Sequence, residues 1–166
     1  MDPIPRNNKT FILEWRPAIS SYKMENFENE FKNFDDAWFN WSVWDWKELE
    51  EGDEFYMIKC GEGVTGIVMH GEFTSEAYQD EDWSGKGRVV YYADMEPDTM
   101  IHPDKCRLLT TQALEAAMPD FQWNGGHSGR ILPEAYAKKL REMWLEYLAM
   151  NDDFFNEEGK AVRRII

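Results

Sequence analysis

The chain has 166 residues, of which 43% are apolar, and a formal net charge of −14. This length and composition favour one globular domain, residues 1–166, with a core of its own. The charge argues against sequence-blind binding to nucleic acid, which depends on many contacts from Lys and Arg to phosphates. The start, MDPIPRNNKT, lacks the apolar run of a signal peptide, and no stretch suits a membrane span. We therefore expect a cytoplasmic protein with no membrane partner.

The charge is distributed unevenly along the chain. Residues 1–125 hold 25 acids and 11 bases, whereas residues 126–166 hold seven of each. A polyanion would therefore approach the C-terminal part and the segment of Lys86 and Arg88, because the acids at 48–54 would repel it. The alternative is that the acids form a solvated surface that aids solubility.

Residues 10–16 predict a first strand, and residues 24–34 predict a short amphipathic helix with apolar side chains spaced 3, 4 and 3. The stretch 38–46, WFNWSVWDW, holds four of the eight tryptophans and favours a strand, because aromatic and β-branched side chains suit a pleated surface. Neither face of that strand is fully polar. Its indoles indicate either an aromatic-rich core or a stacking site for a flat ligand.

The middle of the chain predicts strands at 54–59, 66–74 and 88–95. Gly71 is a candidate bulge, residues 75–87 form a polar loop, and Pro97 and Pro103 mark turns. A helix over 110–117 follows, with Thr110 or Thr111 as its N-cap. The longest helix covers 132–150, with Pro133 in its first turn and Asn151 at its end. Residues 152–166 read as a charged, poorly ordered tail. The fold class is α+β, with a strongly curved sheet or small barrel flanked by helices.

The sequence offers no catalytic set. The histidines at 70, 102 and 127 lack metal-site spacing, and the two cysteines, Cys60 and Cys106, read as buried thiols. No nucleophile elbow or phosphate-binding P-loop occurs. We expect a binding module rather than an enzyme, with no metal and no cofactor.

Residues 124–130, NGGHSGR, combine three glycines with Ser128 and Arg130 ahead of a helix. Backbone N–H groups at Gly125 and Gly126 can converge into an anion-binding nest, and Arg130 can clamp a phosphate. The alternative is a connecting loop in which Arg130 pairs with a local acid. Trp83, in the polar loop, either packs on the core or meets a ligand, with Lys86 and Arg88 close by in sequence.

The order of these features resembles the PUA-like superfamily, and within it the EVE and YTH domains, over residues 38–147. Trp41-Ser42-Val43 resembles the Trp-Ser-Thr that opens the YTH core, and Gly52-Asp53 resembles the turn before a strand in EVE domains. The strand at 66–74, Trp83, the strand at 88–94 and the segment 128–130 follow in the same order as in those families.

The resemblance implies a curved mixed sheet or small barrel and a pocket for one modified base of DNA or RNA. In that pocket Trp41 and Trp83 would sandwich the base, and Ser42 would read its edge. The residues that would contact phosphate are Lys86, Arg88, Gly125, Gly126, Ser128 and Arg130. The acidity of the chain argues against a nucleic-acid polymer more than against a single base. A free nucleotide or nucleoside, or another flat small molecule, would fit the same pocket. The alternative function is an acidic protein-interaction or adaptor domain, whose protein partner would meet an aromatic hot spot.

Overall fold

The computed structural model describes residues 8–81 and 89–164. The strands of this part are β1 (Thr10–Trp15), β2 (Phe39–Ser42), β3 (Glu54–Lys59), β4 (Gly66–Phe73), β5 (Tyr78–Glu81), β6 (Val89–Ile101), β7 (Leu109–Thr110), β8 (Arg130–Ile131) and β9 (Ala161–Arg163). The helices are α1 (Met24–Lys32), α2 (Thr111–Ala117) and α3 (Glu134–Met150), and the 3-10 turns are η1 (Phe34–Asp36), η2 (Trp46–Glu48) and η3 (Asp152–Asn156).

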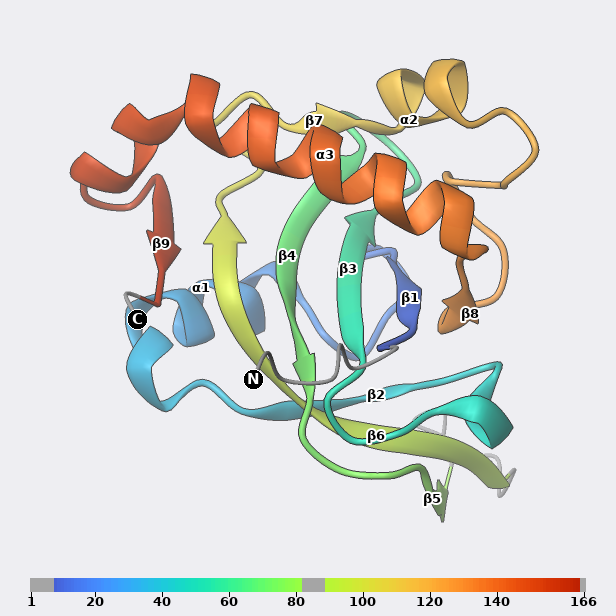
Figure 1. Ribbon diagram of the computed structural model, residues 1–166. Coiled ribbons are helices and arrows are strands. Elements are labelled where there is room, and N and C mark those ends of the chain that lie inside the picture. The colour runs from blue at the N-terminus through green and yellow to red at the C-terminus, as the bar shows by residue number, and fades with distance from the viewer. Residues whose placement is uncertain (1–7, 82–88, 165–166) are drawn as a thin grey trace, which may run out of the picture.

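The strands form one curved, mixed sheet with helices packed against it (Figure 1). The order along the sheet is β2-β6-β4-β3-β1-β8, with β5, β7 and β9 attached beside β6, β4 and β6. Among the strands of the described residues, β1 pairs with β3 in parallel, and the other pairs are antiparallel. This arrangement confirms the predicted fold class and agrees with the PUA-like fold that the resemblance of the sequence implies.

Strand β1 is buried along its whole length. It lies between β3 and β8, and all six of its residues are shielded from solvent, including Glu14. A strand that is covered on both faces is usually a continuous apolar run. An acid in such a strand must find a partner or hold a proton, and the partner of Glu14 is Arg130 of β8, 3.0 Å away.

Strand β6 runs much further than the sequence predicts. The turn expected at Pro97 is absent, because β6 continues through it to Ile101. Pro97 lies opposite Gly71, where the register between β4 and β6 shifts as predicted, but the extra residue is Asp98 of β6 rather than Gly71. A bulge tolerates a proline because it leaves one N–H of the ladder unpaired. A Cβ on Gly71 would collide with the carbonyl oxygen of Glu96, which explains the glycine.

The helices follow their sequence signals closely. The Thr110 side chain accepts a hydrogen bond of 3.2 Å from the N–H of Ala113 and caps α2, as predicted. Helix α3 is flanked by Pro133 and Asn151, as expected, and lies across β3 and β4 (Figure 1). Its buried face consists of Ala137, Leu140, Trp144 and Tyr147. This face closes the core on one side of the sheet.

Three segments differ from their predictions. The strand expected over 38–46 ends at Ser42, because the N–H groups of Trp44 and Asp45 leave β6 and bond to the carbonyls of Ser128 and Gly129. The polar loop at 75–87 contains the short strand β5. The expected tail contains η3 and β9, and β9 pairs with β6.

Two further properties concern the described part as a whole. Both cysteines carry free thiols, with Cys60 buried and Cys106 half-buried. None of the helices in residues 8–81 and 89–164 combines the length and the apolar composition that crossing a bilayer requires.

Candidate ligand-binding cavity

The residues that the sequence singles out converge on one cavity of about 830 Å³. It opens between β1, β2 and the loop that precedes β8. Trp41, Ser42, Gly125, Gly126 and Ser128 all line it. Cavities of this volume are typical of small-molecule and cofactor sites. The structure thus brings together five predicted site residues that lie up to 87 positions apart in the sequence.

An aromatic cluster forms one wall of the cavity. The Tyr22 ring stacks on Phe39 at 5.6 Å and meets Trp41 edge to face at 5.3 Å. Trp41 is 9% exposed, so it packs in the core and presents only part of its indole to the cavity. Tyr92 completes the aromatic lining. The sequence did not single out Tyr22, Phe39 or Tyr92 as site residues, although all three line the cavity.

Three other tryptophans do not belong to the wall of this cavity. Trp123 is fully buried and donates its Nε1–H to the Met118 carbonyl at 3.1 Å. Trp38 and Trp44 are 57% and 59% exposed, and neither lines this cavity. Tyr22 and Phe39, rather than a further tryptophan, therefore accompany Trp41 in the wall.

Ser128 joins two walls of the cavity. Its Oγ accepts a hydrogen bond of 2.9 Å from the Trp41 indole Nε1–H and another of 2.9 Å from the backbone N–H of Glu14. A hydroxyl that accepts two hydrogen bonds can still donate its own hydrogen. Ser128 therefore fixes the indole relative to β1 and adds a donor to the lining.

Glu14 is the most unusual group of the cavity. Its side chain is 5% exposed, and its Oε1 accepts a hydrogen bond of 3.0 Å from Arg130 Nη2. Its Oε2 is buried and has no hydrogen-bond partner among the described residues. Burial raises the pKa of Glu14 to about 9, although the Arg130 guanidinium favours the ionised form. Burial thus favours the protonated form of this carboxyl group, and the ion pair with Arg130 opposes it.

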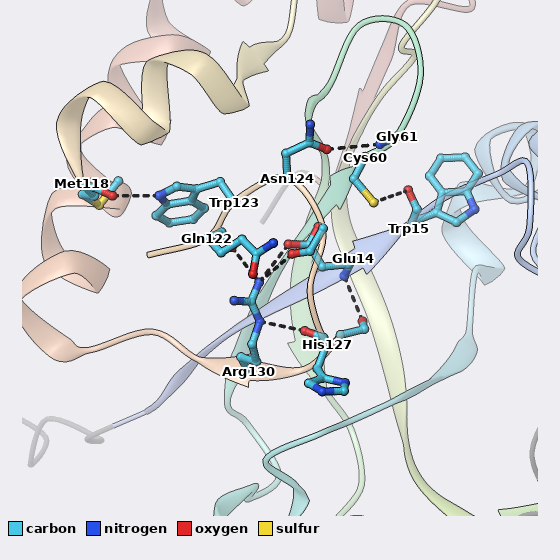
Figure 2. Close-up of polar contacts among 12 residues, drawn as sticks. Glu14, Trp15, Cys60, Gly61, Met118, Gln122, Trp123, Asn124, His127 and Arg130 are labelled. Atoms are coloured by element: carbon cyan, nitrogen blue, oxygen red, sulfur yellow. Dashed lines mark hydrogen bonds and ion pairs between the residues drawn. The ribbon is translucent and has the colours of Figure 1, made fainter. Parts of the chain in front are cut away.

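Arg130, a predicted phosphate contact, reaches inward from β8 (Figure 2). Besides Glu14, its Nη2 approaches the carbonyl oxygens of Gln122 and Gly125 at 2.7 and 3.2 Å. Its Nε donates to the His127 carbonyl at 2.7 Å. The guanidinium also lies over the Phe121 ring at 4.5 Å. These contacts make Arg130 the anchor of the glycine loop and turn its charge toward Glu14.

The glycine loop has the backbone that a nest requires. Gly125 and Gly126 have φ angles of 98° and 96° and line the cavity. Asn124 Oδ1 accepts a hydrogen bond of 3.1 Å from the N–H of Gly61, which ties the loop to the β3–β4 hairpin (Figure 2). The loop is therefore held from two sides. The anion contact assigned to these glycines stays a prediction.

Arg16 is a basic residue at this cavity that the sequence did not single out. It is exposed, it lines the cavity, and its side chain has no hydrogen-bond or ion-pair partner among the residues that the structure describes. Trp83, Lys86 and Arg88 lie outside the described residues, so their assigned contacts also stay predictions. Among the described residues, Arg16 is thus the basic side chain that can contact an anionic ligand in this cavity.

One sequence signal could have found Glu14. It is the single acid in the otherwise apolar or uncharged run of β1, TFILEW. A charged side chain at the centre of a buried strand costs free energy unless it is paired or neutralised. Within residues 8–81 and 89–164, no three His, Cys, Asp or Glu side chains gather as metal ligands do.

No protein-family model matches the sequence, and no curated protein is similar to it. Solved structures do share its architecture. A hypothetical protein from Leishmania major has a TM-score of 0.58 at 11% identity, over 85% of this chain and 97% of that one. A protein from Pseudomonas syringae has a TM-score of 0.52 at 14% identity, over 85% and 98%. A YTH domain of Zygosaccharomyces rouxii in complex with N6-methyladenosine RNA has a TM-score of 0.46 at 14% identity, over 87% and 91%. The first two similarities show that the chain shares the fold of these proteins.

Proposed function

We propose that the chain is a binding domain that recognises a modified nucleobase, in nucleic acid or as a free nucleotide, in the cavity beside Trp41. The observation that carries this proposal is that Ser128 Oγ holds the Trp41 indole and the backbone of Glu14 together at one cavity, which aromatic rings and hydroxyl groups line. A planar aromatic ligand satisfies both features, because it gains stacking energy from the rings and a hydrogen bond at its edge.

The aromatic wall supplies affinity without demanding one base. Stacking of a base on an aromatic side chain contributes roughly 1–3 kcal/mol and depends little on sequence. Tyr22, Phe39 and Trp41 are fixed against one another by ring contacts of 5.3 to 6.2 Å. Because the rings are already in place, ligand binding costs little side-chain entropy.

The polar lining supplies discrimination. The Ser128 hydroxyl accepts two hydrogen bonds and keeps its own hydrogen to donate, so it complements a ring nitrogen or carbonyl oxygen of a base. Ser42 adds a second hydroxyl to the same lining. A ligand without an acceptor at that point leaves a donor unpaired, which costs about 1–3 kcal/mol where the donor is buried. The choice of base should thus depend on the two serines and the affinity on the rings.

Arg16 should give a nucleotide a higher affinity than the matching nucleoside, because its side chain can contact the phosphate. It is exposed at the cavity, whereas the other charged residues of the lining are the acids Glu14, Glu62 and Asp80. One unpaired guanidinium fits one phosphate better than a long polyanion. Arg16→Gln should therefore weaken binding of a nucleoside monophosphate and leave binding of the nucleoside unchanged.

The test is isothermal titration calorimetry with adenosine, cytidine, N6-methyladenosine and 5-methylcytidine and their monophosphates. We expect saturable binding of a modified base, with a weaker response to its unmodified parent. Trp41→Phe keeps a ring but loses the Nε1–H, and should weaken binding. Trp38→Phe is the matched control, since Trp38 is exposed and does not line the cavity. Folded wild-type protein that binds none of these compounds would contradict the proposal.

A further inference from the structure

A second aromatic surface lies next to the proposed base site. Trp44, Trp46, Tyr91 and His127, with Val89 at its edge, line a groove of about 680 Å³, which we call the Trp44 groove. Trp44 stacks on His127 with 3.6 Å between ring centroids and 4° between planes. Trp46 stacks on Tyr91 at 3.5 Å and 8°. Two parallel ring pairs thus stand on one surface.

The backbone holds these rings in place before any ligand arrives. Trp44 N–H donates to the Ser128 carbonyl at 2.9 Å, and Asp45 N–H donates to the Gly129 carbonyl at 3.0 Å. The Asp45 side chain accepts a hydrogen bond of 2.8 Å from the N–H of Ile131. The stretch after β2 is thereby attached to the loop that carries His127. The Trp44–His127 pair is consequently a fixed platform rather than a pair of free surface side chains.

The platform leaves apolar surface open to solvent. Trp44 is 59% exposed and Val89 is 60% exposed. Exposed apolar patches on a protein surface often mark a binding site. Parallel rings offer a further flat ring an extension of the same stack. The charged residues of the lining are Lys47, 5.7 Å from the Trp46 ring centroid, and the acids Asp45 and Glu48. The rings therefore select the occupant, and a second base satisfies them because its ring stacks.

The groove is adjacent to the first cavity, because Ser42 and Ser128 line both spaces. A chain of two nucleotides can then place one base beside Trp41 and the next beside Trp44, with the linking phosphate near the two serines. The glycine loop that carries Ser128 and His127 contributes to both spaces.

We infer that the Trp44 groove is a second base subsite and that the ligand is a single strand of at least two nucleotides. This inference rests on the proposed function, because it places the neighbour of the base held beside Trp41. It predicts that a dinucleotide binds more tightly than its nucleoside. The stacking energy of one base corresponds to roughly tenfold in affinity.

The experiment compares nucleosides with dinucleotides by calorimetry. The probes are the four nucleosides named above and the dinucleotides in which uridine precedes or follows each of them. The wild-type protein should bind one dinucleotide about tenfold more tightly than the matching nucleoside. Trp44→Ala should abolish this gain and leave nucleoside affinity unchanged. Trp38→Ala, an exposed tryptophan outside both spaces, should change neither value.

The outcomes separate the two proposals. If nucleosides bind but dinucleotides bind no more tightly, the second subsite is wrong while the base site stands. If the gain persists in Trp44→Ala, the groove does not hold the second base. If neither nucleosides nor dinucleotides bind, the proposed function fails and the subsite fails with it. Movement of the Trp44 indole NMR signal with the dinucleotide, but not with the nucleoside, would support the subsite independently.

Discussion

The indole Nε1–H of Trp41 donates a hydrogen bond to Ser128 Oγ, across 87 positions of sequence. The same oxygen accepts the N–H of Glu14 from the neighbouring strand. One hydroxyl thus fixes the aromatic wall, the buried acid and the glycine loop relative to one another. The geometry of the cavity depends on Ser128 more than on any residue of the wall itself.

Replacing Ser128 by alanine should destabilise the protein. The change leaves the Trp41 indole N–H and the Glu14 N–H without their acceptor, and each buried unsatisfied donor costs about 1–3 kcal/mol. The free energy of unfolding in urea, followed by circular dichroism, measures the loss. Ser21→Ala is the control, because Ser21 is an exposed residue of the same cavity. Equal stability of the two variants would mean that the hydroxyl is dispensable.

Glu14 should make folding less favourable as pH rises. Burial raises its pKa in the folded protein from the ordinary 4.5 to about 9. A raised folded-state pKa contributes stability that is fully present below about 4.5 and is lost as pH rises through about 9. Glu14→Gln keeps an acceptor for Arg130 and removes the titration. The variant should therefore gain stability relative to the wild type between pH 5 and pH 8, as urea unfolding at both values would measure. A difference that does not change with pH would contradict the shift.

His70 should stabilise the folded protein in its protonated, positively charged form. Its Nδ1 lies 2.9 Å from Asp98 and its Nε2 lies 3.0 Å from Glu54. Burial lowers its pKa, but these two carboxylates outweigh it and raise the value to about 9. The pKa of Glu54 falls to about 2, because hydrogen bonds from His70, Thr10 and Arg141 outweigh its burial.

The stabilising charge pair should therefore be complete between about pH 4.5 and pH 6.5. Below this window the Glu54 contribution is lost as pH falls through about 2, and above it the His70 contribution is lost as pH rises through about 9. His70→Gln should cost most at pH 5.5 and less at pH 9.5. NMR titration of the imidazole gives the pKa directly, and Asp98→Asn should lower it. An imidazole that titrates near 6.5 would overturn this interpretation.

Gly129 should tolerate no side chain. It has a φ of 86°, and a Cβ there would lie 2.5 Å from the Val43 Cα. Gly63 is a matched control, because its φ is 80° but nothing lies within 4 Å of its Cβ position. Both alanine variants lose about 1 kcal/mol from the left-handed backbone. Only Gly129→Ala should add the cost of separating β2 from the loop, so its unfolding midpoint should be clearly the lower. Similar midpoints would show that the close approach relaxes easily.

Local signals in the sequence predicted local structure well. The Thr110 cap and the Pro133 and Asn151 ends of α3 are confirmed, because each depends on the chemistry of a few adjacent residues. A register shift occurs at Gly71 as expected, although its extra residue, Asp98, lies on the partner strand. The parallel pairing of β1 with β3 was not predicted, since it depends on a contact between segments 44 positions apart. Strand β9 was not predicted for the same reason, because its three residues form a strand by pairing with the distant strand β6.

The candidate cavity was predicted in part. Trp41, Ser42 and the glycine loop stand out by residue type, and the structure gathers them. Glu14 and Arg16 did not stand out, because their importance lies in burial and in missing partners, which a sequence does not display. Arg130 was predicted to contact phosphate or, as the alternative, to pair with a local acid. Its four donor contacts run to the distant acid Glu14 and to three loop carbonyls, which depends on the path of the loop rather than on its composition.

The most direct measurement of the central claim is the ¹H–¹⁵N NMR spectrum of the indole N–H groups, titrated with the nucleoside panel. The Trp41 signal should shift in a saturable manner with one modified nucleoside, because its N–H belongs to the lining of the cavity. The signals of Trp38 and Trp123 should stay in place, since neither lines it. A titration that moves the Trp38 signal and leaves Trp41 unchanged, or that moves no indole signal at all, would contradict a base site beside Trp41.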